Sequence, residues 1–210
     1  AIPPDDAEGS NGHWIDPLAM LAFLSAATRT IELGVSILVL PYRPALPTAK
    51  WIASIQALCG ERLYLGVGAG WMAPEFRALG VDQRQRGKIT DDTIRFIRRC
   101  FDAADDIVEQ NGQPFLFRPR PKRPPIYVGG MSDAALKRAA TLGDGWIPMG
   151  INPEKLGPRY EKLRALADAA GRPCPAAAEG GRGRVSSWRG RAAARAEGRR
   201  GRGGGGWAQP

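Results

Sequence analysis

The residues best suited to chemistry lie where an apolar run gives way to a glycine turn. The run Val128-Gly129-Gly130-Met131-Ser132 leads into helix-forming residues at 134–140. A turn without Cβ atoms exposes backbone N–H groups, and a capped helix start adds partial positive charge. This combination suits a phosphate and indicates a phosphorylated cofactor. A plain tight turn between strand and helix is an equally good interpretation of this segment alone.

A second glycine-rich segment, Gly66-Val67-Gly68-Ala69-Gly70-Trp71, follows another apolar run. It does not match the dinucleotide motif GxGxxG, because Trp71 stands where the third glycine would fall. Alternate glycines weaken a strand and need a compensating reason. Close packing at a strand end is one explanation. We favour the other, a mouth where backbone approaches a flat ligand and Trp71 forms a wall.

Other polar residues give weaker signals. Arg84, Arg86 and Lys88 could hold an anionic cofactor tail, but a solvated charged face is the more common explanation. His13 is the only histidine, and no Ser, Cys or carboxylate stands at a spacing typical of a catalytic partner. We therefore assign no general acid or base. Gly34 lies inside a strand pattern, where a packing glycine is somewhat favoured over a bulge.

Regular alternation of strands and helices must position these segments. A helix should start at Asp16-Pro17, an N-cap residue followed by proline, and its apolar surface should be well covered. The further expected elements are strands at 31–40, 126–128 and 144–148, a strand over 62–71 that runs into the glycine-rich mouth, helices at 46–58, 90–101 and 158–170, a helix or turn around 74–79, and a hairpin around Asn111-Gly112. This order predicts parallel strands, in either a doubly wound sheet or a (β/α) barrel.

Residues 176–210 differ from the rest of the chain. They hold ten Gly, eight Arg and eight Ala, no Lys and two Glu, so most of the net charge of +9 lies here. Nothing in this range can bury enough apolar surface to offset chain entropy, and we expect disorder. Arg-Gly pairs favour weak RNA binding, but we consider out-of-frame or otherwise non-native sequence the better explanation.

Composition excludes several other classes of protein. The three cysteines are widely spaced and form no CxxC or Cys/His pattern, so neither a disulfide framework nor a metal site is indicated. No apolar run reaches membrane-spanning length, and the first residues are neither a signal peptide nor a normal start. We therefore expect a cytoplasmic protein whose beginning is missing.

Taken together, these motifs resemble the luciferase-like monooxygenase family, and within it the branch that uses the deazaflavin coenzyme F420. The resemblance covers about residues 1–173. It is carried by Thr28-Arg29-Thr30-Ile31-Glu32-Leu33-Gly34, by the run 62–71 with 75–80, by Pro125-Ile126-Tyr127-Val128-Gly129-Gly130 and by Gly143-Asp144-Gly145-Trp146.

The resemblance implies a TIM-type (β/α)8 barrel of the bacterial luciferase-like type, with the cofactor at the carboxyl-terminal mouth of the strands. It places the cofactor phosphate at the Gly-Gly turn, the ring beside the glycine mouth, and a non-prolyl cis peptide bond against the ring at Ser36–Ile37. The cofactor-binding residues expected on this basis are Ser36, Ile37, Gly68, Gly70, Trp71, Val128, Gly129, Gly130, Met131 and Ser132. The implied cofactor is coenzyme F420, with FMN as the alternative, and the implied partners are a small organic substrate and a second copy of the chain.

The chain also departs from the family pattern. A histidine that commonly ends the family's second strand would precede Ala1, and Trp71 stands where some relatives carry a catalytic Glu. The last two strands are replaced after residue 173, so about four of eight strands are matched. We expect a partial barrel over 1–175 of an oxidoreductase that transfers hydride or oxygenates its substrate. The alternatives are a non-catalytic truncated remnant and weak nucleic-acid binding through the tail.

Overall fold

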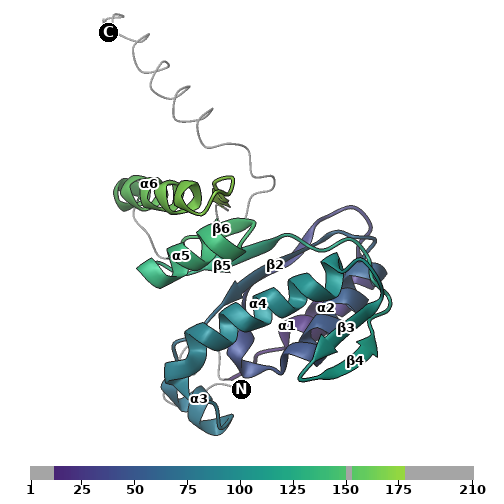
Figure 1. Ribbon diagram of the computed structural model, residues 1–210. Coiled ribbons are helices and arrows are strands. Elements are labelled where there is room, and N and C mark those ends of the chain that lie inside the picture. Colours follow the sequence, from purple (N-terminus) through teal and green to yellow (C-terminus); the bar gives the residue numbers. More distant parts are fainter. Residues whose placement is uncertain (1–11, 150–152, 178–210) are drawn as a thin grey trace, which may run out of the picture.

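A five-stranded parallel sheet forms the centre of the protein. The computed structural model describes residues 12–149 and 153–177. The strands follow one another in the order β1 (Leu33–Val39), β2 (Leu63–Gly68), β5 (Ile126–Gly129), β6 (Gly145–Ile147) and β7 (Ala176–Ala177). A doubly wound sheet reverses its strand order at a switch point, whereas this order runs in one direction. Successive strands of a (β/α) barrel wall follow this one-directional order, as predicted. Figure 1 labels β2, β5 and β6 of the sheet.

Helices connect these strands and begin at the expected capping residues. The Asp16 carboxylate accepts hydrogen bonds from the N–H groups of Leu18 and Ala19, and Pro17 occupies the first helical position. At the start of another helix, the Ser132 hydroxyl accepts from the N–H of Ala135. The helices are α1 (Pro17–Ala27), α2 (Ala45–Leu58), α3 (Ala73–Ala78), α4 (Arg86–Asp102), α5 (Asp133–Leu142) and α6 (Pro153–Ala169), with 3-10 turns at Leu40–Tyr42 and Gln83–Gln85.

The two faces of the sheet carry different side chains. The side chains on one face are buried in a core that they share with the helices. They include Leu65, Val67, Ile126, Val128 and Trp146. Side chains alternate along a strand, so the neighbours of these residues point to the other face.

On that other face, tyrosine rings lie over glycines of adjacent strands. Tyr64 covers Gly34 and Tyr127 covers Gly145, and a Cβ atom at either glycine would overlap the ring. The two rings meet edge to face, with centroids 5.9 Å apart. Gly34 is thus a packing glycine, which was the favoured interpretation.

A hairpin lies between α4 and β5, as predicted. Strands β3 (Ile107–Gln110) and β4 (Gln113–Leu116) pair antiparallel, and Asn111 and Gly112 both have positive φ in the turn. Val108 of the hairpin is buried in the core, as is Phe117 directly after β4, and both anchor the hairpin.

Ion pairs fix the amino-terminal ends of β5 and β6. Asp144 accepts from Arg98 and Arg123, both at 2.6 Å, and from the Ile126 N–H. Burial alone would raise the pKa of Asp144, but the hydrogen bonds from Arg123 and Ile126 and the charges of both arginines hold it below its ordinary value. The structure thereby ties α4 to the loops that precede both strands.

Several sequence-based expectations were wrong. Helix α4 begins at Arg86, so Asp91 and Asp92 lie beyond its first turn and pair with Arg138 and with Lys88 instead. Helix α6 begins before Pro158 and contains it. The apolar helix α1 is not well covered, because Phe23 is 70% exposed.

The boundary of the predicted tail also shifts. Ala176 and Ala177 pair with β6 as strand β7, although they fall in the range assigned to the tail. Two alanines carry no strand pattern of their own, and pairing with β6 decides their conformation. The rest of the predicted tail lies outside the described residues.

Candidate cofactor site

The carboxyl ends of β1, β2 and β5 bring the predicted ring-binding residues together. The Ser36–Ile37 peptide bond is cis, as the resemblance implied. It lies in an irregularity of the β1–β2 pairing between Val35 and Leu38. Ser36 is exposed and Ile37 is half-buried, so both present surface at the mouth.

The side chain of Ile37 lies between Gly68 and Gly129. A Cβ atom at Gly68 would overlap Cδ1 of Ile37, and one at Gly129 would lie 2.9 Å from its Cγ2. A Cβ atom at Gly66 would overlap the Val35 carbonyl oxygen. Close packing therefore accounts for the glycines at 66 and 68, the explanation that the sequence analysis ranked second.

The end of the glycine-rich loop lies at the rim of the mouth. Gly70 has a φ of 75°, and a Cβ atom there would meet Val39 at 2.7 Å. Trp71 is 74% exposed, and its carbonyl oxygen accepts from Gln83 at 2.8 Å. This hydrogen bond holds the backbone of Trp71, while its indole is exposed. The role of the indole as a wall of the cofactor site stays a prediction.

The turn after β5 has the form of an anion cradle. Gly130 has a φ of 120°, which L side chains rarely adopt, and a Cβ atom there would lie 3.1 Å from that of Ala135. Its N–H donates to the Ile147 carbonyl, and its own carbonyl accepts from the Trp146 indole at 2.8 Å. Both backbone groups of Gly130 therefore hold the turn in place.

The next four N–H groups are available to a ligand. Within the part of the chain that the structure describes, the N–H groups of residues 131–134 have no hydrogen-bond acceptor. The Ser132 hydroxyl is engaged as the cap of α5, and Met131 is half-buried beside it. The Val128 side chain, by contrast, lies in the core on the helix face, so only its backbone could meet a ligand at the mouth.

Charged groups surround this turn. The Asp133 carboxylate pairs with Arg159 and Lys162 of α6, each at 2.7 Å. Hydrogen bonds from Lys162 and then Arg159 hold the pKa of Asp133 below its ordinary value. Two cations against one carboxylate leave the local field positive, which suits an anion. The residues present therefore fit a phosphate group.

A pair of side chains that the sequence analysis missed lies at the same mouth. The Tyr42 hydroxyl donates to Oε2 of Glu75 at 2.5 Å. Tyr42 follows β1 and Glu75 follows the loop after β2. Because the ends of adjacent parallel strands meet at one edge, this chain order was the signal that could have revealed the pair.

The remaining candidates do not join the site. Arg84 pairs with Asp82 and is exposed, and Lys88 pairs with Asp92, which supports the solvated-face interpretation for both. His13 is exposed. Among the described residues, no group of three or more His, Cys, Asp or Glu could hold a metal ion.

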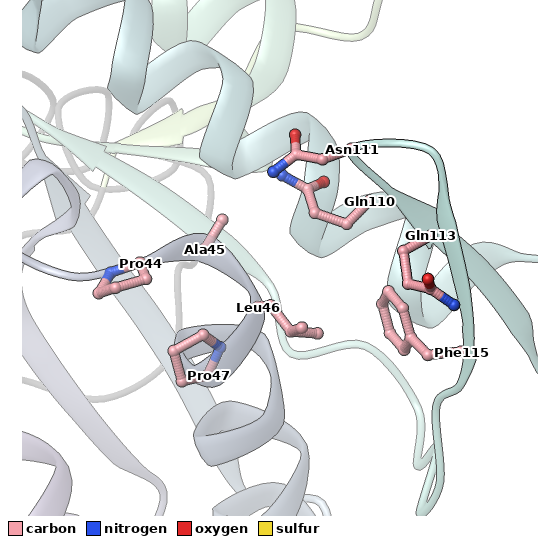
Figure 2. A pocket seen from close by; sticks show the side chains of 8 residues that line it. All are labelled: Pro44, Ala45, Leu46, Pro47, Gln110, Asn111, Gln113 and Phe115. Atoms are coloured by element: carbon pink, nitrogen blue, oxygen red, sulfur yellow. The ribbon is translucent and has the colours of Figure 1, made fainter.

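One hollow lies away from these residues. It has a volume of about 480 Å³ and separates the first turn of α2 from the β3–β4 hairpin (Figure 2). Its lining is Pro44, Ala45, Leu46, Pro47, Gln110, Asn111, Gln113 and Phe115. None of the predicted cofactor-binding residues belongs to it, so it gives them no support.

Comparison with protein families identifies the fold. The family model described as luciferase-like monooxygenase matches residues 5–206. The chain belongs to the luciferase-like monooxygenase family. The match extends past residue 173, where the sequence analysis ended the resemblance, and the division at residue 175 stays a prediction.

Proteins of several kinds are similar to this chain. An uncharacterised protein of Mycobacterium tuberculosis is 34% identical over 82% of the chain and 62% of its own length. An FMNH2-dependent dimethylsulfone monooxygenase of Pseudomonas fluorescens is 31% identical over 70% of the chain and 42% of its length. An F420-dependent glucose-6-phosphate dehydrogenase of Kineococcus radiotolerans is 30% identical over 77% and 51%.

A solved structure agrees with the fold. The monooxygenase RslO1 from Streptomyces bottropensis matches with a TM-score of 0.65 and 26% identity, over 75% of this chain and 51% of that one. The chain thus spans between two fifths and two thirds of the luciferase-like proteins that it matches. Among the described residues, no helix is both long and apolar enough to cross a membrane.

Proposed function

We propose that the chain is part of an oxidoreductase that binds coenzyme F420 or FMN at the carboxyl ends of β1, β2 and β5. The observation that carries the proposal is the turn after β5, where Gly130 has a φ of 120° and the N–H groups of residues 131–134 are available. A helix start of this kind binds phosphate through its N–H groups and dipole. Both cofactors carry a phosphate that a short ribityl chain joins to a flat ring.

The other residues support the ring in this proposal. Ser36 and Ile37 would contact one face of the ring. Gly68 and Gly129 have no side chains, which leaves space for the side chain of Ile37. When bound, the cofactor supplies the electron chemistry, either hydride exchange with a small organic substrate or oxygenation, while the protein orients the reactants. F420 is named first because the sequence motifs resemble the F420-using branch of the family; an F420-dependent protein and an FMNH2-dependent one are both similar to the chain.

The phosphate contact can be tested at Ser132. Asp and Asn are helix caps as good as Ser, so Ser132→Asp and Ser132→Asn both keep α5 capped. Only the first adds a negative charge where the phosphate would lie. We expect the Asp variant to bind F420 and FMN at least about tenfold more weakly in fluorescence titrations, and the Asn variant to bind like the wild type.

Riboflavin is the control ligand, because it has the ring of FMN without the phosphate. Its affinity should be equal in the two variants. Equal FMN affinity in Ser132→Asp and Ser132→Asn would contradict the phosphate site. Failure of the folded wild-type chain to bind either cofactor would favour the non-catalytic remnant instead.

We also propose that the protein pairs with a second copy through α1 and α2. Helix α1 carries no charged residue, and Phe23 on it is 70% exposed. On the adjacent α2, Trp51 and Leu58 are 50% and 69% exposed, and their spacing of seven places them on one helix face. Large exposed apolar side chains on two helices that contact each other are typical of interaction surfaces.

A further inference from the structure

Trp146 on β6 is the largest side chain that the described part of the chain buries completely. It pairs in register with Val128 of β5, and its indole N–H donates to the Gly130 carbonyl at 2.8 Å. The indole nitrogen is a donor only, so a buried tryptophan needs an acceptor within reach. Here the acceptor is a backbone group of the turn after β5, which links a core side chain directly to the proposed phosphate site.

A second hydrogen bond from β6 also holds Gly130. The Gly130 N–H donates to the Ile147 carbonyl at 3.2 Å. This bond acts on the peptide unit that joins residues 129 and 130, whereas the indole bond acts on the unit that joins residues 130 and 131. Among the described residues, the indole is therefore the only group that holds the second unit.

The second peptide unit carries the first free donor of the turn. The bond between residues 130 and 131 is trans. In a trans peptide unit the C=O and N–H groups point in opposite directions. Because the Gly130 carbonyl is directed at the indole in the core, the Met131 N–H is directed away from it, and within the described ranges this N–H has no acceptor. The indole thus determines the direction of that donor.

A flip of this peptide unit would reverse the charge that the turn presents. The carbonyl oxygen would take the place of the N–H group and bring its negative partial charge toward a bound phosphate. A flip needs rotation about the backbone of Gly130, and glycine permits such rotation more readily than any other residue. Gly130 has no side chain to oppose the rotation, so the opposition comes from the indole hydrogen bond.

We propose that Trp146 is a positioning residue that makes the site selective for phosphate-bearing ligands, because its indole keeps the Met131 N–H directed at the phosphate. The inference rests on the proposed function, since it concerns the same turn. Loss of the indole N–H should weaken the binding of ligands that carry a phosphate and spare those that lack one. Loss of core packing alone would weaken both kinds of ligand alike.

Two substitutions remove the indole donor. Trp146→Phe keeps an aromatic ring, and Trp146→benzothienylalanine keeps both fused rings with a sulfur atom in place of the N–H group. Phe96→Leu is the packing control, because it also removes a buried ring, one that packs near Phe115 of the hairpin. Denaturant unfolding is measured first, and the benzothienylalanine variant carries the test if Trp146→Phe does not fold.

The affinities for FMN and riboflavin are then compared by fluorescence titration, with F420 and its phosphate-free deazaflavin as a second pair of ligands. In both Trp146 variants we expect the affinity for FMN to fall about tenfold, as for one lost hydrogen bond to a charged group, and the affinity for riboflavin to stay unchanged. Phe96→Leu should keep the wild-type ratio of the two affinities. A wild-type ratio in the Trp146 variants would overturn the inference.

A second readout follows the donor itself and needs no cofactor. The sequence contains four methionines, so a chain with isotope-labelled methionine gives four amide signals in nuclear magnetic resonance, and Met131→Leu identifies the one of interest. When inorganic phosphate is added, this signal should move in the wild type and in Phe96→Leu, and stay in place in Trp146→Phe. An equal movement in Trp146→Phe would mean that the indole does not direct the N–H group, and the inference would be wrong.

The wild type separates the two proposals. If the folded wild type binds neither FMN nor F420, or binds them no more tightly than their phosphate-free counterparts, the proposed phosphate site and this inference fail together. If the wild type prefers the phosphate-bearing ligands and the Trp146 variants keep that preference in full, this inference alone fails.

Discussion

The side chain of Ile37 occupies the space that a side chain on Gly68 would need, since a Cβ atom there would overlap Cδ1 of Ile37. Gly66, two residues earlier on the same strand, faces a different obstacle, the carbonyl oxygen of Val35. The tip of a side chain can move at low cost, whereas a strand backbone moves only at high cost. Gly66 and Gly68 belong to one sequence pattern, but a side chain at Gly66 should cost more stability than one at Gly68.

This difference predicts the stability of two alanine variants. Gly68→Ala should lower the free energy of unfolding by about 1 kcal/mol, because Ile37 can shift its terminal methyl group. Gly66→Ala should cost about 3 kcal/mol or more, because β1 itself must move. Denaturant unfolding measures both.

The double variants provide the control. Ile37→Val removes Cδ1 and should restore most of the stability of Gly68→Ala. It should leave the Gly66→Ala defect unchanged, since that clash is with backbone. Equal rescue of both variants would contradict the packing described here.

The half-buried carboxylate of Asp144 predicts a loss of stability in acid. Its pKa is lowered in the folded state, so its contribution is present above the unfolded value of about 3.9 and disappears as pH falls through the folded value. At neutral pH, Asp144→Asn should lose about 3 kcal/mol, because Arg98 loses its carboxylate partner and Arg123 keeps only Asp102.

The difference between wild type and Asp144→Asn should therefore shrink as pH falls below about 4. Unfolding curves recorded at several pH values measure it. Exposed Asp168→Asn is the matched control and should follow the wild type throughout. A difference independent of pH would show that the arginines do not act on Asp144 through charge.

The half-buried Tyr42 phenol predicts a loss of stability in alkali, because burial and then the hydrogen bond and charge of Glu75 raise its pKa. The pKa of Tyr42 is raised in the folded state, whereas an unfolded tyrosine ionises near pH 10. Above about pH 10 only the unfolded chain releases this proton, so the free energy of unfolding falls as pH rises. Tyr42→Phe should lack this component of the fall, and Tyr64→Phe should retain it. Identical pH dependence in all three proteins would exclude the effect.

Much of the wall of the barrel could be predicted from local sequence. The Asp16-Pro17 start, the Asn111-Gly112 turn and the Ser132 cap each fix the backbone with residues that are adjacent in the chain. Parallel order followed from the alternation of strands and helices. Strand β7 could not be predicted, because two alanines become a strand only by pairing with β6.

The candidate site was predictable only where backbone chemistry determines it. The Gly129-Gly130 turn carries its signal locally, and the resemblance supplied the Ser36–Ile37 cis bond. The reason for Gly68 depends on Ile37, which lies on another strand 31 residues earlier. The Tyr42–Glu75 bond likewise joins residues 33 apart, and no spacing rule links them.

The exposed apolar surface of α1 and α2 predicts a dimer that charge can dissociate. In Phe23→Glu/Trp51→Glu, two carboxylates would have to be buried against their copies in the partner, where desolvation and like charge both oppose association. Each position is at least half exposed in one chain, so the fold itself should lose little stability. We expect the wild type to sediment as a dimer and the double variant as a monomer with unchanged circular dichroism. Leu116→Glu, at a 67% exposed position on the hairpin, should remain dimeric. If wild type and double variant sediment alike, α1 and α2 do not form the interface.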